Sequence, residues 1–129
     1  MPTFLGPFTF DDFPEDNRLK KLNVAEAELD FSNAAGTINL GDILQVNSIV
    51  VQVFVRVLLP FNGTPNLTVG DSIISDKWLD NGGTDLSVPG IFLGFIFETI
   101  SALTQARVYW SPNGCSVGKL QVYLLISDP

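Results

Sequence analysis

The sequence predicts an all-β domain: a jelly-roll-like β-sandwich of eight or nine strands, preceded by an extended N-terminal arm. Apolar side chains recur every second residue, and β-branched residues dominate these stretches. Gly, Pro and Asn separate the stretches at short intervals, and no segment keeps the 3.6-residue period of an amphipathic helix. A chain of 129 residues is long enough for one sandwich and too short for a second independent core.

The first part of the chain differs in composition from the rest. Residues 1–23 combine acids and three prolines with four of the ten phenylalanines, which are too apolar for a solvated tail. Proline also blocks regular strand pairing. The segment either folds back onto its own domain or forms an arm that fills pockets on a neighbouring subunit. We predict an arm over residues 1–23 and a sandwich over residues 24–129. The candidate contact residues on the arm are Phe4, Phe8, Phe10 and Phe13.

The segments with the strand pattern follow one another through the rest of the chain. The first alternates apolar residues with acids, which predicts a half-buried strand with one wet face. The third is long and β-branched, and Pro60 ends it because proline cannot donate to a ladder. The fifth fits either a strand or a single helical turn. In order, the segments are Val24–Phe31, Thr37–Leu40, Gln45–Leu59, Asn66–Val69, Ser72–Leu79, Leu86–Val88, Ile91–Phe97, Leu103–Trp110 and Leu120–Ile126.

Two of these segments are apolar on both faces. In Gln45–Leu59 we expect Val51, Val53, Val55, Val57 and Leu59 on one face and Val50, Gln52, Phe54, Arg56 and Leu58 on the other. The segment Ile91–Phe97 carries Ile91, Leu93, Phe95 and Phe97 on one side and Phe92 and Ile96 on the other. A small sandwich normally wets the outer face of each sheet. A second apolar face therefore needs a cover, for which the arm and a neighbouring subunit are the two candidates.

Composition argues against several classes of chemistry. The chain has no histidine, so histidine triads, metal sites and proton shuttles are excluded. The single Cys115 cannot form an intramolecular disulfide or a cysteine zinc cluster. Nothing places Glu98 and Asp85 in one cleft, as glycoside hydrolysis needs, and we expect Glu98 to cap a strand end in solvent. Seven basic and fourteen acidic residues give a net charge of −7, which argues against a nucleic-acid partner. We predict no enzymatic activity and no cofactor.

The acidic, glycine-rich stretch from Gly70 to Asp85 is the best candidate for calcium because it offers carboxylate and amide oxygens. Its spacing departs from an EF-hand, since Trp78 stands two residues after Asp76. Asp and Asn in such loops more often bond nearby backbone groups, so we expect turns and no metal. The longest apolar run, Ile49–Leu59, is far shorter than the ~20 residues of a membrane-spanning helix. No basic residue precedes Arg18, so we expect neither a leader nor a membrane partner.

Two stretches resemble a known group of proteins. The run Pro60–Asp71, which reads PFNGTPNLTVGD, is similar to a phrase in small virion proteins of tailed bacteriophages. In those proteins an apolar strand runs into a "pro-phe-asp-gly-thr … leu-thr-ile-gly" sequence. Ala106–Tyr109, taken with Gly118–Ile126, resembles their C-terminal hairpin. The resemblance extends from Val50 to Ile126.

Within that group the chain most resembles capsid decoration, or cement, proteins. The resemblance implies a non-enzymatic virion protein on the outer capsid surface that bridges major capsid protein subunits and stabilises the shell. It implies synthesis in the host cytoplasm, a homo-oligomer with a trimer favoured, and an arm that clamps adjacent capsid subunits. Two alternatives stay open. A tail-fibre or tail-tip carbohydrate-binding module would need Trp78 or Tyr109 exposed on one sheet face, and a head–tail connector or tail-completion protein would form a ring.

Overall fold

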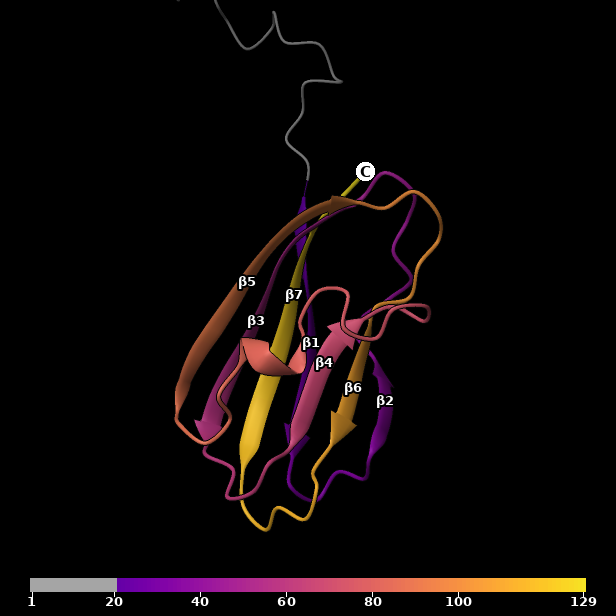
Figure 1. Ribbon diagram of the computed structural model, residues 1–129. Helices are drawn as coiled ribbons and strands as arrows, with labels where there is room; N and C mark the ends of the chain where they lie inside the picture. Colours follow the sequence, from indigo (N-terminus) through magenta and orange to yellow (C-terminus); the bar gives the residue numbers. More distant parts are fainter. Residues whose placement is uncertain (1–20) are drawn as a thin grey trace, which may run out of the picture.

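A computed structural model describes residues 21–129, which form two antiparallel sheets packed face to face (Figure 1). The predicted arm, with Phe4, Phe8, Phe10 and Phe13, lies outside the described residues except for its last three positions. A short 3-10 helix, η3 (Asn81–Gly83), precedes the fifth strand. The strands are β1 (Leu22–Asp30), β2 (Gly36–Asn39), β3 (Ile49–Leu59), β4 (Asn66–Gly70), β5 (Gly90–Thr99), β6 (Arg107–Ser111) and β7 (Lys119–Ser127).

The two sheets are built from strands that alternate along the chain. The larger sheet has the order β1-β7-β3-β5 and the smaller one the order β2-β6-β4. Each strand therefore lies in the opposite sheet from the strand before it. Such connections across two antiparallel sheets are typical of a jelly roll, so the predicted jelly-roll-like sandwich is confirmed.

The described residues contain seven strands rather than the eight or nine expected, because two predicted segments do not pair as strands. Ser72–Leu79 keeps only an isolated bridge between Leu79 and Val69, and Leu86–Val88 forms no ladder. The Asp71 carboxylate accepts hydrogen bonds from the backbone N–H groups of Ile73 and Ile74, each 2.8 Å long. These bonds curl the chain directly after β4 and compete with strand pairing.

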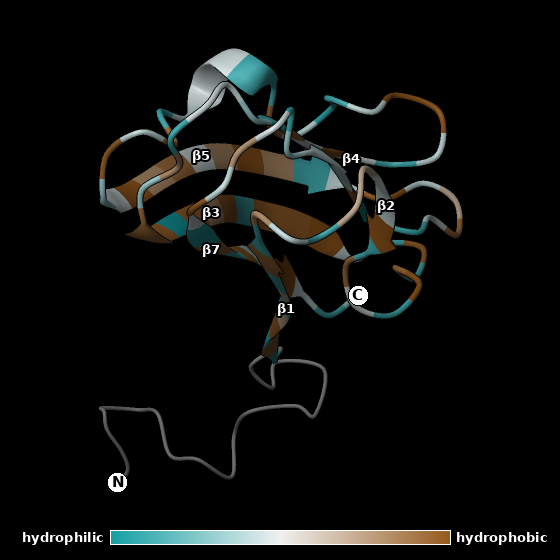
Figure 2. Cartoon of the chain, turned by 90° about the horizontal axis from the view of Figure 1, so that it is seen from below, coloured by the Kyte–Doolittle hydropathy of each residue, from teal (hydrophilic) through white to brown (hydrophobic). Residues whose placement is uncertain are grey.

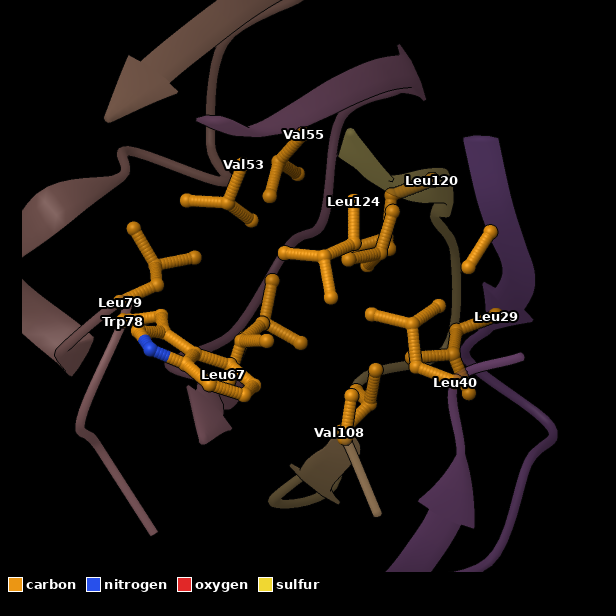
Figure 3. Close-up of a cluster of buried hydrophobic side chains, with 14 of the residues drawn as sticks. Leu29, Leu40, Val53, Val55, Leu67, Trp78, Leu79, Val108, Leu120 and Leu124 are labelled. Atoms are coloured by element: carbon orange, nitrogen blue, oxygen red, sulfur yellow. The ribbon is translucent and has the colours of Figure 1, made fainter. Parts of the chain in front are cut away.

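The core lies between the sheets and is formed mainly by the inner faces of β3, β6 and β7. Val53, Val108 and Leu124 are fully buried. Trp78 and Leu79, from the segment between β4 and β5, join the same cluster (Figure 3). Each fully buried aliphatic side chain contributes about 1.5–3 kcal/mol. The segment from 71 to 89 is thus anchored in the core although it forms no strand.

A β-bulge in β3 changes which side chains face the core. The register of β3 against β7 shifts between Val50 and Gln52, so Val51 has no partner in the ladder. One extra residue turns the following side chains to the other face, and Val50 is consequently buried together with Val53. The expectation that Val50 lies on the face opposite Val53 is wrong, because strict alternation cannot reveal an unpaired residue.

Candidate protein-interaction face

The outer face of β5 presents four large apolar side chains to solvent. Figure 2 shows that β5 is hydrophobic along much of its length. The four side chains, which we call the β5 strip, are Ile91, Leu93, Phe95 and Phe97, with 62%, 57%, 73% and 66% of their surface exposed. Contiguous apolar surface of this kind is uncommon on a protein that works alone.

The opposite face of β5 packs inward. Phe92 and Ile96 are half-buried against the core. Gly94 lies between them, where a Cβ atom would stand 3.2 Å from Cγ1 of Val53. The missing side chain lets β5 lie close over the core. The strand is therefore apolar on both faces, as the sequence predicted, and within residues 21–129 only the inner face is covered.

Phe97 adopts a backbone conformation that large L-residues rarely take. Its φ angle is 51°, in the left-handed region. The residue lies at a shift in register between β5 and β3, flanked by the pairs Glu98–Val50 and Phe95–Gln52. Its ring stacks parallel to that of Phe95, with 6.2 Å between centroids and 3° between planes. A left-handed conformation costs about 1–2 kcal/mol, and such strain is concentrated at functional positions.

Three rows of side chains run from the β5 strip across the outer face of the four-stranded sheet to β1. One row ends at an apolar residue of β1, and the other two end at acids. Phe95 is in register with Gln52, Leu125 and Val24 on the successive strands. The next two rows are Leu93, Phe54, Tyr123 and Glu26, and Ile91, Arg56, Gln121 and Glu28. Partial burial and the Glu26 carboxylate raise the pKa of Tyr123. The face is therefore apolar near β5 and acidic near β1.

The two edges of this sheet are protected to different degrees. β1 and β5 are its edge strands. Natural edge strands usually carry charges or prolines that prevent pairing with another chain. β1 carries Glu26, Glu28 and Asp30, whereas β5 has no charged residue before Glu98. The β5 edge therefore lacks the charges that would keep another protein chain from packing against it.

The outer face of the smaller sheet is polar instead. Along β6, half-buried positions alternate with the buried Val108 and Trp110. The Tyr109 hydroxyl donates a hydrogen bond to the backbone carbonyl of Asp71. The outward positions of the three strands are Thr37, Asn39, Asn66, Thr68, Arg107, Tyr109 and Ser111. The two outer faces of the sandwich thus differ in chemistry, and the β5 side is the one suited to a dry protein contact.

A polar network fixes the segment between β4 and β5 to the end of β5. The Lys77 ammonium lies 2.8 Å from a carboxylate oxygen of Glu98 and 3.4 Å from one of Asp71. The indole N–H of Trp78 donates to Glu98 over 2.9 Å. Glu98 is therefore half-buried and paired, and the expectation that it caps a strand end in solvent is wrong. The sequence carries no signal for this pairing, because its partners meet only in the folded chain.

The ionisation of this network is set by its hydrogen bonds. Burial alone would raise the pKa of Asp71, but the N–H groups of Ile74 and Ile73 and the charge of Lys77 outweigh it and hold the pKa below its ordinary value. The hydrogen bond and charge of Glu98, together with Asp71, raise the pKa of Lys77. Asp71 and Lys77 are therefore charged over the neutral pH range and hold each other in place.

The other residues that the sequence analysis considered for binding or chemistry serve the fold. Trp78 is in the core and Tyr109 lies on the smaller sheet, so they do not form one aromatic platform. Asp85, like Asp71, accepts a local backbone hydrogen bond, from Ser87, as expected for a turn. Cys115 is buried. Within residues 21–129 no three acidic or cysteine side chains gather as a metal site. No helix in this part of the chain has the length and apolarity needed to cross a bilayer.

The sequence matches no protein-family model and no curated protein. Its fold, however, is similar to chains in three capsid structures. A chain of the acidic stable capsid of Helicobacter pylori bacteriophage KHP30 has a TM-score of 0.68 and 20% identity, covering 87% of this chain and 91% of that one. A chain of the cyanophage Pam1 capsid has a TM-score of 0.60 and 18% identity, covering 100% of this chain and 98% of that one. A chain of the capsid of Ralstonia phage GP4 has a TM-score of 0.58 and 16% identity, covering 90% of each chain. The chain thus has a fold that occurs in the capsids of bacteriophages.

Proposed function

We propose that the protein is a capsid cement, or decoration, protein of a tailed bacteriophage. In this role it binds the outer surface of the shell and bridges major capsid protein subunits. The observation that carries the proposal is the β5 strip, which no residue in the range 21–129 covers, on a domain whose fold is similar to chains in phage capsids. The sequence resemblance to small virion proteins supports the same role.

The strip supplies part of the contact with the shell. Phe95 and Phe97 together expose roughly 300 Å², judged from the area that aromatic side chains bury. At about 25 cal/mol per Å², covering them contributes several kcal/mol before the cost of association. A stable interface buries about 1,600 Å² in total, so the strip needs further contacts beside it.

The N-terminal arm supplies these further contacts. We assign Phe4, Phe8, Phe10 and Phe13 as anchors that fill pockets between neighbouring capsid subunits, because buried aromatic anchors dominate interface energies. A homo-oligomer, with a trimer favoured, presents several strips and arms to one joint of the shell. The net charge of −7 suits an outer position away from packaged DNA.

Shells of the encoding phage, prepared without this protein, test the proposal. Added protein should co-sediment with the shells and raise the temperature at which they break open. A variant in which all four arm phenylalanines are replaced by serine should bind more weakly and protect less. Light scattering of the free protein measures its oligomeric state. Shells that neither bind the protein nor gain heat resistance would rule out the cement role.

A further inference from the structure

We propose that, before assembly, the N-terminal segment of the same chain (residues 1–20) lies across the β5 strip and shields it from water. This cover belongs to the free protein, whichever partner covers the strip later. Without such a cover, a free protein with an uncharged apolar edge is prone to aggregate.

The position at which the chain enters the sheet favours this occupant. Leu22, the first residue of β1, is in register with Ser127, Ile49 and Thr99 on the successive strands. The N-terminal segment therefore joins the sheet at the end where β5 carries Phe97. Three strand spacings, about 14 Å, separate β1 from β5. The residues between Phe13 and Leu22 can span about 30 Å when extended, so Phe13 can reach the strip within its own chain.

The surface between these points is apolar enough to guide the segment. Val24 is 57% exposed, and Leu125 and Phe95 lie in the same row across the sheet. Phe8 and Phe10 share one face of an extended chain, because side chains alternate. Pro7 and Pro14 lack the N–H groups that an added strand would donate. The segment is therefore expected to pack over the face through its side chains and not to extend the ladder.

Charge supports the same placement. Arg56 is exposed on this face, in register with Ile91 of the strip. It forms no ion pair with another residue in the range 21–129. The N-terminal segment carries Asp11 and Asp12 between Phe10 and Phe13. A carboxylate from this pair can approach Arg56 while the flanking rings cover the strip.

The test uses the full chain and a dye, 8-anilinonaphthalene-1-sulfonate (ANS), that fluoresces on exposed apolar surface. The variant Phe10→Ser/Phe13→Ser should show a several-fold rise in dye fluorescence over the wild type, while a cooperative urea transition shows that its sandwich is still folded. The same two changes in a Phe95→Ser/Phe97→Ser background should give no rise, because the strip itself is gone. Arg56→Gln should raise fluorescence, whereas the matched surface change Lys119→Gln should not.

The other outcomes separate the alternatives. Strong dye binding by the wild type, unaltered by the arm changes, would show an open strip and overturn the proposal. Weak binding by both proteins would overturn it as well, and a concentration-dependent mass in light scattering would then identify a second copy as the cover. No shell is present in these measurements, so their failure leaves the proposed capsid function to its own test.

Discussion

Lys77 places its ammonium 2.8 Å from a carboxylate oxygen of Glu98 and so ties the segment after β4 to the end of β5. Glu98 also accepts a hydrogen bond from the buried Trp78. Glu98 follows Phe97 directly and pairs with Val50 beside the shift in register. The network therefore braces the part of β5 that turns Phe97 outward. The strip is therefore presented by a strand whose end this network holds in place.

Replacing Asp71 by alanine should destabilise the domain. The carboxylate is buried, accepts two backbone hydrogen bonds and lies beside Lys77. Its loss leaves two backbone N–H groups and the Lys77 ammonium without their partner, and we expect a decrease of about 2 kcal/mol in the free energy of unfolding. Urea unfolding measures the change. Asp76→Ala, an exposed acid in the same segment, is the matched control and should alter stability by less than about 0.5 kcal/mol. Equal effects would show that Asp71 has no special part.

The same carboxylate makes stability fall in acid. Its pKa lies below the ordinary value of 3.8, so the fold favours the charged form. That contribution is fully present above pH 3.8 and is lost as the pH falls through the lower pKa of the folded state. Asp71→Asn should therefore unfold at lower urea than the wild type at neutral pH and lose less stability on acidification. Parallel pH profiles for the two proteins would contradict this assignment.

Truncating a leucine to alanine should destabilise the domain strongly in the core and hardly at all in the β5 strip. Leu124 is fully buried between the sheets, and Leu124→Ala should cost about 3 kcal/mol of stability. Leu93 is exposed among residues 21–129, and in the Phe10→Ser/Phe13→Ser background, where the N-terminal segment no longer covers the strip, Leu93→Ala should change the free energy of unfolding by less than about 0.5 kcal/mol. Thermal or urea unfolding of both variants checks the contrast. A large loss of stability in Leu93→Ala would mean that the strip serves the fold and not a partner.

The backbone of Phe97 allows a sharper comparison. Glycine adopts a positive φ without the clash that a Cβ atom causes. Phe97→Gly should therefore be more stable than Phe97→Ala by about 1 kcal/mol, while both lose the ring stacked on Phe95. Urea midpoints of the two variants decide the point. If the alanine variant equals or exceeds the glycine variant, the left-handed conformation stores no strain.

Much of the fold could be predicted because period-two alternation reports directly on burial in a sandwich. In β7 the alternating apolar residues Leu120, Val122, Leu124 and Ile126 are all buried, as this pattern predicts. It also predicted that Ile91–Phe97 is apolar on both faces, which identified the strip itself.

The remaining features depend on contacts that local patterns do not encode. The bulge at Val51 interrupts the alternation without changing the type of residue. The segment Ser72–Leu79 looks like a strand, but the turn that Asp71 closes prevents its pairing. Lys77 and Glu98 are polar residues far apart in the chain, and only the packing of one segment on β5 brings them together.

The affinity of the protein for shells that lack it tests the central claim most directly. Phe95 and Phe97 are exposed in the domain and act, in this account, as anchors on the shell. Phe95→Ser/Phe97→Ser should fold normally and raise the Kd for shells by about 30-fold or more, the effect of losing a binding hot spot. Thr37→Ala/Thr68→Ala, on the polar outer face of the smaller sheet, should leave the Kd unchanged. A serine variant that binds shells as tightly as the wild type would contradict the claim that the β5 strip is the docking face.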